Sequence, residues 1–129
     1  MIVDPSAIAA ILLREPEGEH FRAVLEKHGA LMSAPSYLEL AIVLASTGVS
    51  NAGPTLDAVL SGLGVDVVPF TLHQARLAQE AHQRFGRGSG HPAKLNFGDC
   101  ITYALAKDLG EALLYKGDDF GHTDLQFAP

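Results

Sequence analysis

The chain has 129 residues, of which 47% are apolar, and its formal net charge is −6. This length fits one domain, and the apolar fraction is high enough to fill one core, which excludes a disordered chain. The acidic balance argues against a domain that binds nucleic acid by bulk electrostatic attraction.

The cysteine content and the N-terminus indicate a reducing compartment. Cys100 is the only cysteine, so no intrachain disulfide can form, and a zinc site would need more Cys or His ligands at close spacing. Met1 is followed by Ile-Val-Asp4 with no basic region, and the apolar run 7–13 is too short to span a membrane. We therefore expect a cytoplasmic protein with no membrane partner.

The first half of the chain predicts two strands separated by helices. Pro5 suits the first turn of a helix, Gly29 ends a helix, and Ser36-Tyr-Leu-Glu39 has the capping-box pattern that opens a helix. The expected elements are a strand at 1–3, helices at 5–13 and 17–28, a strand at 30–33, a helix from 36 to 46, a turn at 51–54 and a helix with Leu56, Val59, Leu60 and Leu63 on one side.

The second half continues the alternation of strands and helices. The expected elements are a strand at 65–69, a helix at 72–85 capped by Thr71, a flexible loop at 86–90, a helix at 97–109 capped by Asn96 and ended by Gly110, a strand at 112–115 and a candidate short strand at 125–127. This order predicts one α/β domain over residues 1–129, with a mainly parallel central sheet of four or five strands and helices on both faces. Its crossovers should be right-handed.

Acidic residues follow the expected strands where a parallel α/β sheet binds its ligands, outside the carboxyl ends of the strands. Asp4 directly follows the first strand, and Glu39 lies in the expected first turn of the helix after the second strand. Asp118 and Asp119 follow the fourth strand. Asp99 lies in the first turn of the helix that leads to that strand, so its helix start is expected at the same edge.

Each of these acids taken singly is explained by helix capping or by turn formation. The set is more informative, because at about 5 Å and an effective dielectric near 20 each pair of carboxylates repels by roughly 3 kcal/mol. Such a cluster needs a cation, and oxygen ligands favour Mg²⁺ or Mn²⁺ over zinc. The chemistry that this site serves is attack on a phosphodiester by a metal-activated water.

Several segments resemble a PIN domain, and within that family the VapC toxins of bacterial toxin–antitoxin pairs. The resemblance covers the whole chain, and its most specific parts are Asn96-Phe-Gly-Asp99-Cys and Lys116-Gly-Asp118-Asp-Phe120. The other segments are Met-Ile-Val-Asp4-x-Ser6, Ser36-Tyr-Leu-Glu39, Phe85-Gly-x-Gly, His91-Pro-Ala-x-Leu95, Tyr103-Ala-Leu-Ala106, Leu113-Leu-Tyr and Thr123-Asp124.

The resemblance implies a Mg²⁺-dependent endoribonuclease, with Mn²⁺ as an alternative metal. It implies that Asp4 and Asp99 are the principal metal ligands and that Glu39 completes the catalytic site, with Asp118 as the fourth acid and Asp119 as the alternative. Ser6 and Asn96 are further candidates for orienting the ligands. The family also implies an RNA substrate, a homodimer and a cognate antitoxin of the VapB kind that blocks the cleft.

Two positions depart from the pattern of the family. Pro5 follows the first aspartate where many PIN domains have Thr or Ser, although Ser6 keeps a hydroxyl nearby. The last motif reads Lys116-Gly-Asp118-Asp119 where many members have Thr-x-Asp, which leaves the identity of the fourth acid open between the two aspartates.

A basic segment precedes the helix that carries Asp99. No acid lies between Glu80 and Asp99, whereas three of the nine Lys and Arg residues do, and by composition alone this is a solvated loop. In a ribonuclease the same residues could contact the RNA backbone, which positions a substrate without reading its sequence. The candidate RNA contacts are Arg84, Arg87 and Lys94.

Two other functions fit parts of the pattern. A receiver domain of a signalling pathway is also a small parallel α/β fold, and Lys116 fits it, but it needs a phosphoacceptor at the end of a middle strand. Asp66 lies inside its strand and Asp57 within a helix, so that position is empty. A PIN-like fold used only for binding is the second alternative, and the presence of all the acids counts against it.

Overall fold

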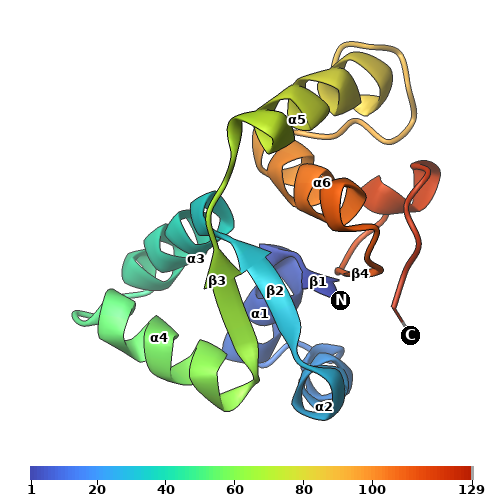
Figure 1. Cartoon of the computed structure of the whole chain (residues 1–129). Helices are drawn as coiled ribbons and strands as arrows, with labels where there is room; N and C mark the ends of the chain where they lie inside the picture. Colours follow the sequence, from blue (N-terminus) through green and yellow to red (C-terminus); the bar gives the residue numbers. More distant parts are fainter. Residues whose placement is uncertain (129) are drawn as a thin grey trace.

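The computed structural model describes residues 1–128, which form a sheet of short strands between two groups of helices (Figure 1). The elements in chain order are β1 (Ile2–Val3), α1 (Pro5–Leu12), α2 (Gly18–His28), β2 (Ala30–Ser33), α3 (Ala34–Ser46), α4 (Ala52–Gly62), β3 (Val65–Val68), α5 (Leu72–Phe85), α6 (Phe97–Leu109), β4 (Leu113–Leu114) and the 3-10 helix η1 (Asp119–His122).

The sheet has four strands in the order β3-β2-β1-β4, and every pair of neighbours is parallel. The chain adds β2 and β3 on one side of β1, and then crosses back through α5 and α6 to place β4 on the other side. The direction of winding therefore changes at β1, and ligands bind beside such a point in open α/β sheets. Asp4 follows β1 directly, so the topology places it there.

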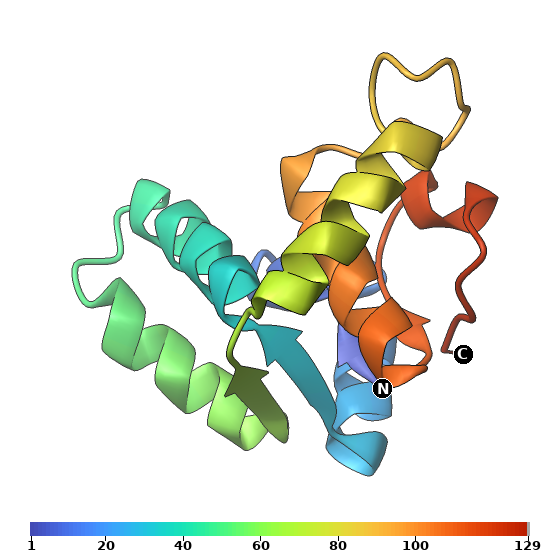
Figure 2. The same ribbon diagram turned by 45° about the horizontal axis from the view of Figure 1, so that its top comes forward.

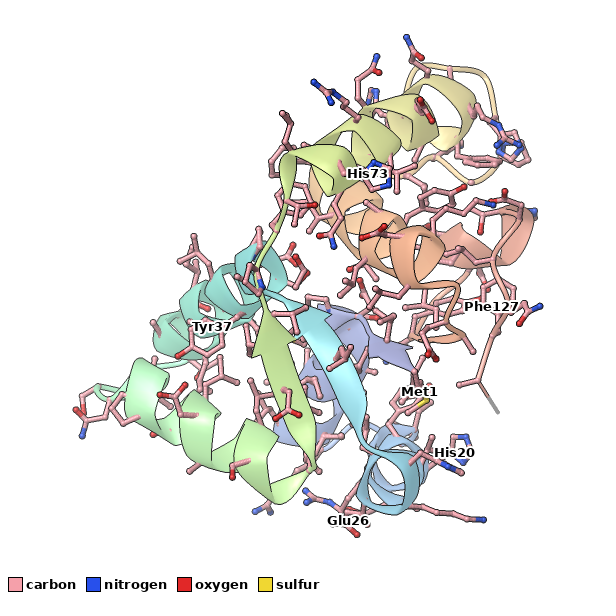
Figure 3. All side chains as sticks on the ribbon, viewed as in Figure 1. Met1, His20, Glu26, Tyr37, His73 and Phe127 are labelled. Atoms are coloured by element: carbon pink, nitrogen blue, oxygen red, sulfur yellow. The ribbon has the colours of Figure 1, made fainter. Side chains whose placement is uncertain are left out.

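Helices cover both faces of the sheet, as the alternation of elements predicted. Because successive side chains of a strand point to opposite faces, Val3 packs with α1 to α4, whereas Ile2 packs with α5 and α6. Figure 1 shows α3 and α4 to the left of the sheet, α2 below it and α1 behind its strands, with α5 and α6 above. On the first face, the Tyr37 hydroxyl of α3 donates to Asp57 of α4 at 2.7 Å and helps to hold these two helices together (Figure 3).

Three local expectations are wrong. Helix α3 begins at Ala34, not at Ser36, because Pro35 is accommodated in its first turn, and no side chain caps it. Glu39 therefore lies in the second turn and forms no capping box. Helix α4 begins at Ala52, so Pro54 belongs to its first turn and not to a preceding turn. The candidate fifth strand is only an isolated bridge between Leu113 and Phe127.

The segment between α5 and α6 projects from the molecule beyond the end of α5 (Figure 2). Its base is closed by two backbone hydrogen bonds, from Leu95 N to Phe85 O at 2.8 Å and from Arg87 N to Leu95 O at 3.0 Å. The glycine-containing loop expected at 86–90 is thus anchored at its start. Within residues 1–128, no helix has both the length and the apolar character needed to cross a membrane.

Candidate functional site at the carboxyl edge of the sheet

Asp4 is the most enclosed acid of the predicted cluster, with 6% of its surface exposed. It is the N-cap of α1, and its Oδ2 accepts from the backbone N of Ser6 at 3.0 Å. Its Oδ1 accepts from the Thr102 hydroxyl at 2.7 Å. Burial raises the pKa of Asp4 above its ordinary value, while the hydrogen bonds from Ser6 and Thr102 oppose that rise and the charge of Asp119 adds to it.

Asp99 is held in the first turn of α6 by the capping box that the sequence predicted. The Asn96 side chain accepts from Asp99 N at 2.9 Å, and Asp99 Oδ2 accepts from Asn96 N at 3.0 Å. Burial raises the pKa of Asp99 to about 7, against the smaller effect of the Asn96 backbone hydrogen bond. The negative charges of Asp4 and Asp119 contribute to the rise, which places three carboxyls in one electrostatic cluster.

Glu39 reaches the cluster from α3, across the first turn of α6. A Cβ atom at Gly98 would lie 2.8 Å from Glu39 Oε1, so a larger residue there would displace this carboxyl from its present position. Partial burial raises the pKa of Glu39, and the charge of Asp4 raises it further. A cavity of about 240 Å³ is lined by all three of these acids, Asp4, Glu39 and Asp99.

Of the two neighbouring aspartates after β4, Asp119 is the one that interacts with the cluster. Asp119 contributes to the raised pKa of both Asp4 and Asp99. Asp118 acts instead on the pKa of Tyr115, together with Asp119. The segment is anchored by Phe120, which is buried against the Tyr115 ring at a centroid distance of 5.1 Å. This electrostatic effect favours Asp119 as the fourth acid, whereas the resemblance had favoured Asp118.

Ser6 and Asn96 lie where they can orient the acids. The Ser6 hydroxyl accepts from Lys116 N at 2.9 Å and also hydrogen-bonds Asp4, so it joins the segment after β4 to the start of α1. Sequence reasoning missed Thr102 and Gly98. The only feature of the sequence that could have indicated these two residues is their spacing from Asp99. Thr102 lies three residues after Asp99 on the same face of α6, and Gly98 directly precedes Asp99.

The donor set fits a hard divalent cation. Its ligand atoms are carboxylate oxygens, and no lysine or arginine of residues 1–128 forms an ion pair with these acids; Lys116, the nearest in sequence, pairs with Glu15 and Glu17. In the same residues no three acidic, His or Cys side chains converge on one point. Mg²⁺ does not require that convergence, because it is usually held by one or two carboxylates, waters and substrate oxygens.

We expect the acids of the cluster to destabilise the metal-free protein as the pH rises. Asp99 has a folded-state pKa of about 7 against an ordinary value of 3.8, so the folded state binds the proton more tightly. Its stabilising contribution is complete below pH 3.8 and is lost as the pH rises through about 7. Asp99→Asn, which keeps an oxygen for the capping box, should raise the melting temperature of the metal-free protein at pH 8 by roughly 4 °C or more, and by clearly less at pH 5, which lies between the two pKa values.

Thermal unfolding in the presence of EDTA at both pH values measures this effect. Asp57→Asn, on α4 away from the cluster, is the matched control and should show no difference between the two pH values beyond that of the unmodified protein. An equal response of Asp99→Asn and Asp57→Asn would contradict the prediction.

The basic segment is only partly free to contact a ligand. Arg84 pairs with Asp124 at 3.8 Å, and its guanidinium lies 4.6 Å from the centroid of the Phe85 ring. Arg87 and Lys94 are exposed on the projecting segment between α5 and α6. The structure therefore leaves Arg87 and Lys94 more accessible than Arg84.

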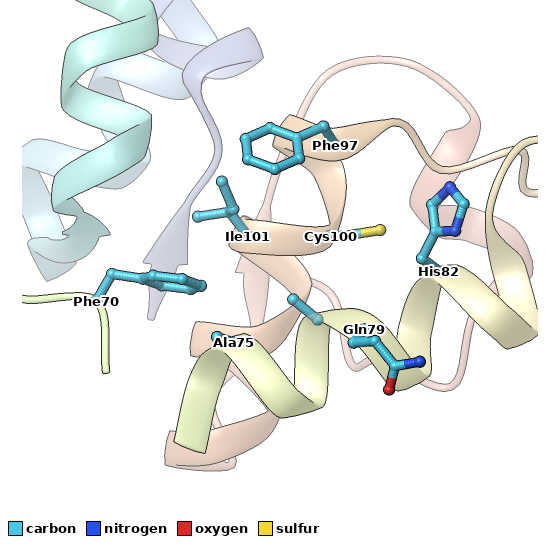
Figure 4. Close-up of a pocket in the computed structure, with 8 residues that line it drawn as sticks. Phe70, Ala75, Gln79, His82, Phe97, Cys100 and Ile101 are labelled. Atoms are coloured by element: carbon cyan, nitrogen blue, oxygen red, sulfur yellow. The ribbon is translucent and has the colours of Figure 1, made fainter. Parts of the chain in front are cut away.

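An exposed apolar face adjoins the carboxylate cluster. Phe97 and Ile101 line two cavities, one of about 410 Å³ (Figure 4) and one of about 320 Å³, and the smaller one is also lined by Glu39. Phe97 is 82% exposed, although it is a large apolar side chain. We define the apolar face as the exposed and half-buried side chains that line these cavities, Leu38, Ile42, Val43, Phe70 and Phe97. Such a face is typical of a surface that binds another protein.

Over nearly its full length the chain is similar to known proteins of one family. A profile of the PIN domain family matches residues 1–125. The chain is 50% identical over 129 residues to Ribonuclease VapC28 of Mycobacterium tuberculosis. The alignment covers 99% of this chain and 97% of that protein. The chain is 43% identical over 127 residues to Ribonuclease VapC42 of the same species, with 98% and 97% covered.

A solved structure has the same fold. The crystal structure of Mycobacterium tuberculosis VapC20, a toxin that cleaves the sarcin-ricin loop, matches with a TM-score of 0.74 over 98% of this chain and 97% of that one. The two sequences are 17% identical, so this likeness supports the architecture and not a shared substrate.

Proposed function

The chain belongs to the PIN domain family, and on that premise we propose that it is a Mg²⁺-dependent endoribonuclease, the toxin of a type II toxin–antitoxin pair. Its relatives at 43–50% identity are named VapC ribonucleases. The observation that carries the proposal is the cluster of Asp4, Asp99 and Asp119. The charge of Asp119 raises the pKa of Asp4 and of Asp99, the charge of Asp4 raises the pKa of Asp99, and no lysine or arginine of residues 1–128 forms an ion pair with these acids.

In the proposed mechanism, Asp4 and Asp99 hold the ion, and Glu39 and Asp119 complete the site. When bound, Mg²⁺ supplies Lewis-acid stabilisation at the phosphodiester and activates the attacking water. The protein's own contribution is to hold the carboxylate oxygens in place. Ser6 and Thr102 fix the Asp4 carboxylate, and Asn96 fixes that of Asp99. Gly98 leaves room for Glu39 beside the same cleft.

Cleavage of total RNA by the purified, antitoxin-free protein tests this function, with Mg²⁺, with Mn²⁺ and with EDTA. The proposal expects cleavage with either metal and none with EDTA. Cleavage that persists in EDTA would contradict the metal-dependent mechanism. Tight Mg²⁺ binding by a folded protein that cleaves no RNA would instead favour a PIN fold used only for binding.

We propose that Arg87 and Lys94, with a smaller part for Arg84, contact the RNA backbone. Support comes from the exposure of the first two residues and from the partial neutralisation of Arg84 by Asp124. Unchanged RNA cleavage after charge reversal of both Arg87 and Lys94 would remove them from the proposal.

We propose two protein partners, a VapB-like antitoxin that covers the carboxylate cleft and a second copy of the chain on the apolar face. The protruding Phe97 and the two cavities beside it lie on one surface, and a two-fold symmetric interface requires such a self-complementary patch. Figure 4 shows Phe97 and Ile101 among the side chains that line the larger of the two cavities. The side chains that line this face are almost all uncharged, which lowers the cost of burying it.

Ile42→Asp is expected to convert the dimer into a monomer, because it places a charge in the middle of the apolar face. Ile42 is 61% exposed, so the substitution should leave the fold of the monomer intact. Light scattering after size-exclusion chromatography measures the mass. Leu109→Asp is the control, since Leu109 is also exposed but lies at the opposite end of α6 from Phe97. A dimer that survives Ile42→Asp but not Leu109→Asp would place the interface elsewhere.

A further inference from the structure

Thr102 joins the two elements that carry the principal acids. Its side chain is 1% exposed, and its hydroxyl donates to Asp4 Oδ1 at 2.7 Å across a sequence separation of 98 residues. Threonine within a helix can donate its hydroxyl to a backbone carbonyl three or four residues earlier. Here the Thr102 hydroxyl donates to the carboxylate of Asp4, which lies outside α6, and not to a backbone carbonyl of its own helix.

The hydrogen bond from Thr102 completes the support of the Asp4 carboxylate. Oδ2 is held by the backbone N of Ser6 at 3.0 Å, and Oδ1 is held by Thr102. With a donor on each oxygen from opposite sides of the residue, the carboxylate cannot rotate about its terminal bond without losing one of them. With the Ser6 hydroxyl these are three donors, so the four lone pairs of the carboxylate leave at least one free for a cation.

Helix α6 also fixes Asp4 relative to Asp99. Asp99 and Thr102 lie three residues apart on one face of α6, and the capping box holds Asp99 at the helix start. One rigid helix therefore carries a proposed metal ligand and the donor that orients the other ligand. Any shift of α6 relative to β1 would break the Thr102 hydrogen bond.

We propose that Thr102 is a positioning residue, which holds the Asp4 carboxylate in the orientation that binds the divalent cation together with Asp99. This inference rests on the proposed metal-dependent function. Hydrogen-bonding partners of metal ligands contribute about 10- to 100-fold to metal affinity or activity. A role in packing alone would depend on the volume of the side chain and not on its hydroxyl.

Two substitutions separate the hydroxyl from the volume of Thr102. Thr102→Val keeps the shape and removes the hydroxyl, whereas Thr102→Ser keeps the hydroxyl and removes a methyl group. Titration calorimetry of the full-length protein with Mg²⁺ and with Mn²⁺ should give a Kd at least roughly 10-fold higher for Thr102→Val and within about 3-fold of the unmodified protein for Thr102→Ser. Thr47→Val is the control, because its hydroxyl donates only to Leu44 O at the end of α3.

Thermal unfolding of the metal-free proteins and kcat and KM for RNA cleavage are measured alongside. The inference expects kcat at a fixed metal concentration to fall for Thr102→Val and to be rescued in Thr102→Ser, with little change in KM for RNA. Equal metal affinity of a folded Thr102→Val and the unmodified protein would overturn it and leave the proposed function standing. An unmodified protein that binds neither metal would overturn the proposed function, and this inference with it. If Thr102→Val does not fold, Thr102→Ala replaces it in the same comparison.

Discussion

Asp4→Asn and Asp99→Asn are each expected to lower the rate of RNA cleavage by roughly 10³-fold or more. Each substitution removes one negative oxygen from a site that holds a cation, and metal stabilisation of a phosphoryl transition state is worth several kcal/mol, with tenfold in rate for about each 1.4 kcal/mol. The fold should survive, because Asn is a good N-cap in place of Asp4 and its amide oxygen can replace the acceptor in the capping box at Asp99.

The measurement is the initial rate of RNA cleavage at saturating Mg²⁺, with far-ultraviolet circular dichroism to verify the fold. Asp57→Asn serves as the matched control, since Asp57 pairs with Tyr37 on the far side of α3 and should leave the rate unchanged. Retained cleavage by either Asp4→Asn or Asp99→Asn would show that the carboxylate cluster is not the active site, whatever the activity of the protein.

Asp119→Asn is expected to reduce cleavage by about 10- to 100-fold, whereas Asp118→Asn should leave it within about 3-fold of the unmodified protein. The reason is the charge of the Asp119 carboxyl, which raises the pKa of both Asp4 and Asp99. Asp118 interacts with neither of these acids and affects Tyr115 instead. The two substitutions are chemically identical and lie on adjacent residues, so each controls for the other.

Cleavage rates of both variants at several Mg²⁺ concentrations provide the test. Asp119→Asn should also require more Mg²⁺ for half-maximal rate, because its carboxylate completes the site. The reverse order, with the larger loss in Asp118→Asn, would assign Asp118 as the fourth acid. Equal losses in the two variants would point to a general effect on the segment that Phe120 anchors.

The start of α6 shows why part of the site could be predicted from the sequence. Asn96 and Asp99 are three residues apart and satisfy each other's backbone groups, so the capping box depends only on local geometry. The same reasoning is wrong at α3. There Ser36 and Glu39 have the three-residue spacing of a capping box. The helix begins earlier, at Ala34, with Pro35 in its first turn, so both residues lie inside the helix and Ser36 is not the N-cap.

The apolar face and Thr102 are features that could not be predicted from neighbouring residues in the sequence. Leu38 and Ile42 have the spacing of a buried helix face, and only the arrangement of α3, α5 and α6 shows that they are exposed. Thr102 is one of several small residues on a buried helix, and its hydroxyl acquires a role only because β1 passes beside it.

By itself the sequence determined the family, the alternation of strands and helices, and the placement of Asp4 and Asp99 at helix starts, because caps, turns and hydrophobic periodicity are set by residues close together in the chain. Only the tertiary structure shows that the charge of Asp119 acts on Asp4 and Asp99, that Glu39 lies beside Gly98 in the same cleft, and that Thr102 donates to Asp4. These relations join residues far apart in the chain, and they depend on how α3, α6 and the Phe120 segment pack around the end of β1.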